Sequence, residues 1–289
     1  MEKKNYEEKG YLNEDYKIFY LEEMISKEIE YHYHNFDKII IFFKGNMEYI
    51  IEGKSYTLLP NDIVLVPRGD SHKVNLSGYS TTDIGYTRMV IYISPEYLSG
   101  LCDGTESLRD CFVQVAKKHS HVIRLKEKGE NQLFYLIESL KDSACKNSRE
   151  TFHGMYQRTL VMQFLIILNR KMKQDGIYYV GTSCCNQKIV EIIHYINNHL
   201  KDDMDINSLS EKFYISRYHM MRQFKSETGY TIGNYVNQKR LLLAREMLKK
   251  GYPVTKTYLD VGFKEYSTFV RAYKQMFNEI PSKIIKIPE

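Results

Sequence analysis

ISRYHMMRQFK, residues 215–225, is the stretch that decides the fold of the last third of this 289-residue chain. Met220, Met221 and Phe224 recur at spacings of three and four, which predicts a helix with one apolar side. The opposite side is cationic and aromatic, and its members are Arg217, Tyr218, Met221, Arg222 and Lys225. A helix with these two faces suits the major groove of DNA. An ordinary amphipathic helix with a solvated basic face has the same pattern.

The same helix has signals at both ends and a second copy further along the chain. Ser216 can cap its start, and Gly229 stands where a helix end needs a left-handed residue. A shift of about 49 residues turns Arg222-Gln223-Phe224-Lys225 into Arg271-Ala272-Tyr273-Lys274, and Gly229 into Asn278, which also tolerates the left-handed conformation. An internal repeat of this size predicts two helix-turn-helix units.

Positive charge is concentrated in the last third of the chain. Residues 188–289 carry 17 Lys and Arg against 11 Asp and Glu, whereas the preceding 187 residues carry 24 against 25. The formal net charge of the whole chain is only +5. The distribution, and not the total, therefore predicts nucleic-acid binding by the last third.

The remaining composition favours a cytoplasmic protein without a membrane segment. The five cysteines are odd in number and form no CxxC pair, which favours reduced thiols. The charged residues 1–8 do not resemble a signal peptide, and no apolar run approaches the roughly 18–20 residues that span a bilayer.

Short apolar runs separated by turn signals fill the first part of the chain. They cover residues 16–21, 39–43, 47–51, 56–59, 63–66 and 89–93. Gly, Pro, Asn or Asp interrupts them every ten residues or so, which is typical of short strands in a small barrel or sandwich. We therefore predict a β-rich domain over residues 1–95.

Helical periodicity replaces the strand pattern after Pro95. The expected helices cover 107–116, 131–145, 150–173, 188–200, 206–213, the stretch from 216, 231–250, 254–261 and 265–277. Asn207 is the expected cap of the helix over 206–213. The predicted fold class is α+β with two domains: a barrel (1–95) with a helical segment (96–174), then a linker (175–187) and an all-α domain (188–289).

The last hundred residues resemble the DNA-binding domain of the AraC/XylS family of bacterial transcription regulators. The matching residues are Ile215-Ser216, Phe224-Lys225, Thr228-Gly229-Tyr230-Thr231, Arg240, Ala244, Leu248, Asp260-Val261-Gly262-Phe263, Tyr266-Ser267, Phe269, Arg271, Tyr273-Lys274, Phe277 and Ile280-Pro281-Ser282. The resemblance implies two helix-turn-helix units joined by a long helix, here 231–250, with each recognition helix in the major groove of one site. Thr257-Tyr258 departs from the small residues common in the family there.

The resemblance also implies which side chains face DNA. Base-facing positions fall on Tyr218, Met221, Arg222, Tyr266, Ser267 and Arg271, and phosphate contacts are expected from Arg217, Lys225 and Lys274. Arg222 and Arg271 can each pair bidentately with guanine O6 and N7; for both, a phosphate contact is the alternative. Core positions are expected at Phe224, Ala244, Leu248 and Tyr273.

The first domain resembles, more weakly, the cupin-type sensor barrel of the same family. The residues that carry this resemblance are His32-Tyr33-His34, Gly45, Asn61-Asp62-Ile63 and Pro67-Arg68-Gly69-Asp70-Ser71-His72. His32 and His34 would share one face of a strand, and His72 can join them if that face is the interior. Three His can bind a divalent metal. However, Lys38, or at best Asp37, stands where metal-binding cupins supply an acid, so neither metal nor cofactor is predicted.

We instead expect His32, His34, Arg68 and His72 to line a site for a small organic effector. Arg68 is suited to a carboxylate or a sugar hydroxyl. A scaffold role for the histidines, and a solvated turn position for Arg68, are the alternatives.

The two helices 131–145 and 150–173 fit the family's antiparallel dimerisation pair, although they can also merely pad the barrel. The resemblance thus implies a dimeric, effector-responsive activator, and not an enzyme, that binds a double-stranded DNA operator and contacts RNA polymerase. Two alternatives stay open. One is a constitutive DNA binder with a ligand-free assembly barrel. The other is a metal-dependent cupin enzyme fused to a DNA-binding domain, which Lys38 disfavours.

Overall fold

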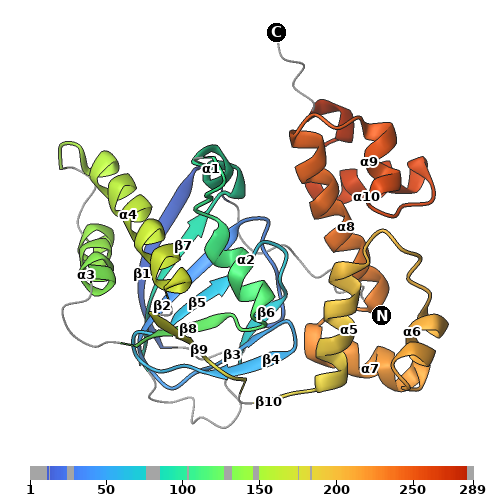
Figure 1. Ribbon diagram of the computed structural model, residues 1–289, viewed down its shortest axis with the longest axis horizontal. Helices are drawn as coiled ribbons and strands as arrows, with labels where there is room; N and C mark the ends of the chain where they lie inside the picture. Colours follow the sequence, from blue (N-terminus) through green and yellow to red (C-terminus); the bar gives the residue numbers. More distant parts are fainter. Residues whose placement is uncertain are drawn as a thin grey trace. The chain divides into compact units, whose positions relative to one another are not determined.

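The computed structural model of the chain describes residues 12, 14–24, 29–75, 85–102, 104–126, 132–145, 150–174, 176–182 and 184–284. Two compact units make up the chain, unit 1 (residues 1–185) and unit 2 (residues 186–289), each of which is described by itself (Figure 1). The charged residues 1–8, Asn131 at the predicted start of a helix, and Asp175 and Ser183 of the predicted linker lie outside the described residues.

The described residues of unit 1 form strands and four helices. The strands are β1 (Tyr16–Met24), β2 (Asp37–Lys44), β3 (Glu48–Ile51), β4 (Lys54–Thr57), β5 (Ile63–Val66), β6 (His72–Asn75), β7 (Gly85–Ile93), β8 (Val122–Leu125), β9 (Ile177–Tyr179) and β10 (Cys184–Cys185). The helices are α1 (Pro95–Gly100), α2 (Asp110–Lys117), α3 (Gln132–Cys145) and α4 (His153–Lys173).

The strands lie in two antiparallel sheets. One sheet has the order β1-β7-β2-β5-β8-β9 and the other has the order β10-β4-β3-β6. An isolated bridge also joins His32 to His72. The sequence predicted a barrel or a sandwich, and the β-rich domain is confirmed; among the described strands the pairing does not close into one ring.

Strand β2 explains how the sheets and helices form layers. Ile39 and Ile41 pack in a core shared with α2, α3 and α4, whereas Ile40 and Phe42 pack in a second core with residues of the four-stranded sheet. Successive side chains of a strand point to opposite faces, so both faces of β2 are buried. This explains why residues 39–42 form an unbroken apolar run instead of an alternating one.

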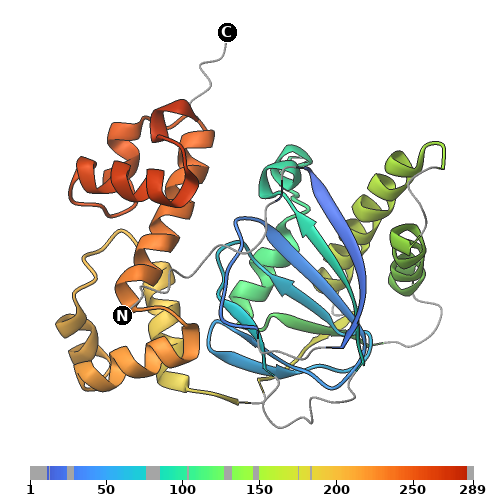
Figure 2. The same ribbon diagram turned by 180° about the vertical axis from the view of Figure 1, so that it is seen from behind.

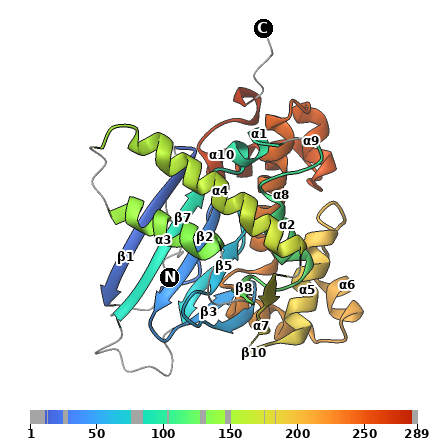
Figure 3. The same cartoon turned by 60° about the vertical axis from the view of Figure 1, so that its left-hand side comes forward.

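Helices α3 and α4 pack against each other and cover the outer face of the six-stranded sheet (Figure 3). Viewed from behind, the strands of unit 1 lie in front of α4 (Figure 2). The fully buried Leu140, Phe164 and Leu168 provide the apolar contacts beneath the two helices. Both helices agree closely with the predicted ranges.

Sequence analysis did not predict β6, β8, β9, β10 or α1. These strands have only two to four residues, so alternation along the chain gives little signal. Strands β9 and β10 lie within the expected linker 175–187, where they pair with β8 and β4. These non-local partners, which a local pattern does not reveal, make this segment part of the sheets of unit 1.

Unit 2 is helical. It contains α5 (Gln187–Asn198), α6 (Ile206–Lys212), α7 (Arg217–Thr228), α8 (Ile232–Lys249), α9 (Val254–Asp260), α10 (Tyr266–Phe277) and the short 3-10 helix η1 (Pro281–Lys283). Helix α8 contacts α5 and α7 on one side and α9 and α10 on the other, so it joins two helix-turn-helix units (Figure 1). This is the predicted organisation.

The ends of these helices follow their capping residues. Ser216 accepts a hydrogen bond from the His219 N–H, which confirms it as the cap of α7. The predicted cap of α6 was wrong: Asp205, and not Asn207, accepts the Ser208 N–H at 2.9 Å. The Asp205 carboxylate, two residues earlier in the chain, reaches this N–H, whereas Asn207 lies inside the first turn.

Candidate DNA interface and sensor cluster

Helix α7 has a buried apolar side and an exposed polar side, as the sequence predicted, and Met221, which was counted on both, lies on the exposed side. Met220 and Phe224 are fully buried, and the Phe224 ring meets Tyr235 of α8 edge to face at 5.4 Å. Gly229 ends the helix with a φ of 78°, the left-handed conformation expected of it. Because these contacts fix the rotation of α7 on the unit, they also decide which side chains point into solvent.

The predicted DNA-facing residues of α7 are all exposed. They are Arg217, Tyr218, Met221, Arg222 and Lys225. Tyr218 is 75% exposed and Met221 is 46% exposed, so this side of α7 presents an aromatic and an apolar side chain to solvent. Spacings of three and four residues place Tyr218, Met221, Arg222 and Lys225 in one stripe along the helix. Arg217 lies at the start, where its guanidinium donates to the Asn207 side chain of α6 at 3.3 Å.

Helix α10 presents a second stripe of the same kind. Tyr266, Ser267, Arg271 and Lys274 are exposed, whereas Phe269 and Tyr273 on the other side are fully buried. Asn278 ends α10 with a φ of 53°, which confirms the predicted equivalence to Gly229. Tyr266 also packs edge to face on Tyr258 of α9 at 5.6 Å.

Polar contacts fix the two helix-turn-helix units on their scaffold. The Arg240 guanidinium of α8 donates to the carbonyl oxygens of Leu200 and Asp202, each at 2.7 Å, and so holds the loop between α5 and α6. Ala244 and Leu248 of α8 are fully buried, as are Phe224 and Tyr273, which confirms the four predicted core positions. A rigid frame of this kind gives the two stripes a fixed spacing.

In unit 1 the structure brings the three predicted histidines together. His32 and His72 are cross-strand partners, and their rings lie 4.3 Å apart, with the His34 ring 5.1 Å from His32 and 5.0 Å from His72. All three are buried. We call His32, His34, His72 and the neighbouring Lys38 the sensor cluster.

Lys38 also belongs to this site, although the sequence analysis named it only where metal-binding cupins supply an acid and not among the effector residues. Its Nζ lies 3.3 Å from His72 Nε2 and donates to the Tyr49 hydroxyl at 3.4 Å. Burial, and to a smaller extent the nearby Arg88, lower the pKa of Lys38 to about 7. Burial, followed by the neighbouring Lys38, also holds the pKa of His72 well below 6.5. One sequence signal was available for this placement. His34, Phe36 and Lys38 are spaced two residues apart, and residues with this spacing on an extended segment lie on the same face.

Asp37 belongs to a different network from the sensor cluster. Its carboxylate accepts hydrogen bonds from the Arg109 guanidinium at 2.8 and 3.2 Å and from the Arg68 backbone N–H at 2.8 Å. The guanidinium of Arg68 forms an ion pair with Glu96 of α1 at 3.5 Å. Arg68 thus contacts both Asp37 and Glu96.

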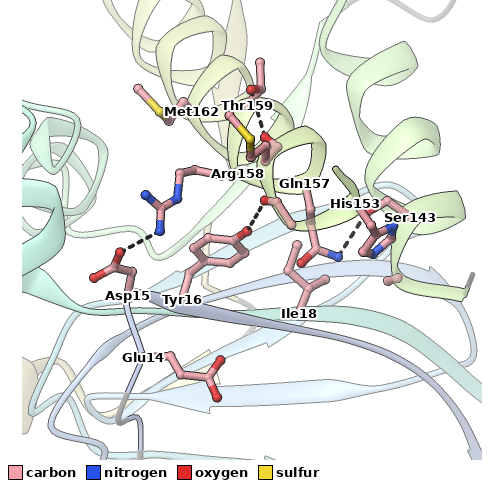
Figure 4. A pocket seen from close by; sticks show the side chains of 13 residues that line it. Glu14, Asp15, Tyr16, Ile18, Ser143, His153, Gln157, Arg158, Thr159 and Met162 are labelled. Atoms are coloured by element: carbon pink, nitrogen blue, oxygen red, sulfur yellow. Dashed lines mark hydrogen bonds and ion pairs between the residues drawn. The ribbon is translucent and has the colours of Figure 1, made fainter. Parts of the chain in front are cut away.

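An open pocket lies where the start of β1 meets α3 and α4 (Figure 4). Asp15 pairs with Arg158 at 3.1 Å, the Tyr16 hydroxyl donates to the Gly154 carbonyl, and Gln157 donates to Ser143 at 3.1 Å. The residues of this pocket are thus engaged with one another. Sequence reasoning missed it because its two walls are more than a hundred residues apart in the chain.

Comparisons with known proteins agree with this arrangement. A family model described as a helix-turn-helix domain matches residues 209–286, and one described as an AraC-like ligand binding domain matches residues 17–147. The chain belongs to the AraC/XylS family. It is therefore a DNA-binding transcription regulator. Within the described residues of this chain, no helix is both long and apolar enough to cross a membrane.

Curated relatives match over most of the chain. The HTH-type transcriptional activator RhaS of Escherichia coli O139:H28 is 23% identical over 254 residues, covering 88% of this chain and 86% of RhaS. RhaS of Salmonella arizonae is 25% identical over 260 residues with the same coverage. Among solved structures, ToxT from Vibrio cholerae O395 is 14% identical, covers 95% of this chain and 99% of its own, and has a TM-score of 0.37.

Proposed function

We propose that this regulator is a dimeric, effector-responsive transcription activator of the cytoplasm that reads one double-stranded operator with α7 and α10. The observation that carries the proposal is the pair of exposed stripes, each with one arginine at its centre. The expected base contacts are Tyr218, Met221, Arg222, Tyr266, Ser267 and Arg271, and the expected phosphate contacts are Arg217, Lys225 and Lys274. The relatives named as transcriptional activators support activation, and contact with RNA polymerase is proposed on the same basis.

Replacing Arg222 or Arg271 with Ala is expected to weaken binding to the cognate operator by about 1–3 kcal/mol and to relax the preference at one base position. Each guanidinium is exposed and has the length to pair bidentately with guanine. Fluorescence anisotropy with operator variants at each position measures both effects.

Lys225→Ala and Lys274→Ala are the matched controls, because each lies one turn further along the same stripe. They are expected to weaken binding to all sequences alike and to reduce its salt dependence. If Arg222→Ala also weakens binding equally on every sequence, Arg222 contacts phosphate and not a base.

The proposed dimer surface is the outer side of α3 and α4. Exposed apolar side chains lie on these two helices and at the start of α4, namely Phe134, Tyr135, Phe152, Met155 and Tyr156. Tyr135 is 59% exposed and Met155 is 68% exposed. Exposed large apolar side chains on a helix pair are suited to a protein–protein contact, and the open pocket of Figure 4 borders Met155.

Replacing both Tyr135 and Met155 with Lys is expected to weaken dimerisation by about 1–2 kcal/mol, since buried aromatic anchors dominate such contacts. Sedimentation velocity over a dilution series measures the change. Tyr178→Lys is the control, because Tyr178 is a comparably exposed aromatic residue on β9. Equal association of all three proteins would contradict this surface.

Effector response is proposed for the sensor cluster, where buried polar side chains converge inside a domain matched by an AraC-like ligand binding model. A constitutive regulator with an assembly domain is the alternative. A ligand that binds the folded state raises the melting temperature, so a thermal-shift screen against metabolites and ions, followed by an operator-reporter assay, separates the two.

A further inference from the structure

The backbone places three histidines around one point. His32 and His72 exchange both backbone hydrogen bonds of an antiparallel bridge, at 3.1 and 2.9 Å, so their side chains project from the same side. His34 follows two residues after His32 on an extended segment and returns to that side. Candidate ligand nitrogens of the three residues all lie within 4.8 Å of one another.

Backbone carbonyls fix the protonation of two of these rings. His32 Nδ1 lies 2.9 Å from the Glu30 oxygen, and His72 Nδ1 lies 3.0 Å from the Asp70 oxygen. A carbonyl only accepts, so each Nδ1 carries a proton, and in the neutral imidazole each Nε2 then carries a lone pair. Metal-binding histidines have this arrangement, with one nitrogen on the metal and the other donating to a carbonyl.

The space between the rings fits one ion better than an organic molecule. Ring centroids 4.3–5.1 Å apart put the three imidazoles in contact with one another. Phe36 stacks on His34 at 4.6 Å, and the Tyr49 ring lies parallel to His72 at 6.0 Å. Nitrogens about 3.3 Å apart suit a tetrahedral ion with bonds of about 2.0 Å, which rotation of the side chains can supply.

Lys38 does not exclude such an ion, and neither does the missing acid. Three histidines and a water suffice for zinc in some enzymes, so a carboxylate ligand is not required. The Lys38 Nζ, 3.3 Å from His72 Nε2, is placed to donate to one of the lone pairs that an ion would use. Lys38 therefore competes with a metal ion for His72 Nε2, and an ion that binds there must displace the Lys38 Nζ.

We propose that His32, His34 and His72 bind a divalent transition-metal ion in exchange for the Lys38 contact, and that this ion is the effector. Imidazole ligands favour zinc, cobalt, nickel, copper or iron over magnesium or calcium. Lys38 belongs to β2, which pairs with both β5 and β7, so its displacement acts on the centre of the six-stranded sheet. The effector role rests on the proposed effector-responsive function, whereas the metal site does not.

The test is titration of the metal-free full-length protein with Co²⁺, followed by its visible absorption, and with Zn²⁺ by calorimetry. One ion per chain is expected, with the intense absorption of low-coordinate Co²⁺. His34→Gln is expected to weaken binding by about tenfold or more, and Lys38→Met is expected to tighten it by about tenfold. His194→Gln is the control, since His194 lies exposed on α5, and it should bind like the wild type.

Circular dichroism and melting curves establish that each variant is folded before titration. Equal Co²⁺ binding by the wild type and His34→Gln would overturn the site, and unchanged or weaker binding by Lys38→Met would overturn the exchange with Lys38. Operator binding is then measured with and without Zn²⁺. Metal binding without any change in operator affinity or reporter output overturns the effector role alone. A metabolite that changes reporter output when no metal binds overturns the metal site and leaves the proposed function intact.

Discussion

Replacing Asp37 with Ala is expected to lower the free energy of unfolding of unit 1 by about 3–5 kcal/mol, because it breaks a buried ion pair by removing one partner. The Asp37 carboxylate is fully buried and accepts two hydrogen bonds from the Arg109 guanidinium and one from the Arg68 N–H. Without it, the Arg68 N–H and the Arg109 guanidinium, whose side chain is 26% exposed, both lose their charged acceptor. Differential scanning calorimetry of the full chain measures the change in the transition of unit 1.

Asp15→Ala is the matched control for this prediction. Asp15 also pairs with an arginine, Arg158, at 3.1 Å, but both side chains are about half exposed. Exposed pairs contribute about 0–1 kcal/mol, so this variant should melt nearly like the wild type. Similar losses from Asp15→Ala and Asp37→Ala would mean that burial is not the cause. Asp37→Asn, which can still accept the Arg68 N–H, is expected to fall between them.

The sequence predicts secondary structure and burial well where a single local pattern of residues determines them. Residues 39–42 are apolar on both faces of β2, and their unbroken run predicts a buried strand without knowledge of its neighbours. In unit 2 the caps Ser216 and Gly229 act within their own helix, so the limits of α7 are readable from the chain. The exposure of Arg222 and Arg271 follows directly from the burial of Phe224 and Tyr273.

Non-local pairing was not predictable in the same way. Strand β9 exists because Ile123 pairs with Tyr179, which lies 56 residues later, and its three residues alone look like a linker. The sensor cluster is a similar case, because the His32–His72 bridge spans 40 residues. The motif residues were reason to group the histidines, but only the packing places Lys38 beside His72. The same residue that argued against a metal ion thus becomes its expected competitor.

Replacing Gly262 with Ala is expected to lower the free energy of unfolding of unit 2 by roughly 2–5 kcal/mol. Gly262 joins α9 to α10 with a φ of 95°, a conformation that costs an L-residue about 1–2 kcal/mol. A Cβ at this position would lie 2.5 Å from the Leu200 carbonyl oxygen and 2.9 Å from the Arg240 guanidinium. Overpacking adds about 1–3 kcal/mol. It would also force apart the Arg240–Leu200 hydrogen bond, which links α8 to the loop between α5 and α6.

Gly251→Ala separates the two causes. Gly251 also has a left-handed φ, of 84°, but a Cβ there would meet no atom within 4 Å, so only the conformational cost of about 1–2 kcal/mol applies. Calorimetry measures the loss in the free energy of unfolding for both variants, and the difference between the two losses is the steric cost at Gly262. Equal losses would contradict the clash with Arg240. Because Arg240 holds the loop between α5 and α6, Gly262→Ala should also weaken operator binding at temperatures where unit 2 remains folded. Gly251→Ala should leave that affinity unchanged.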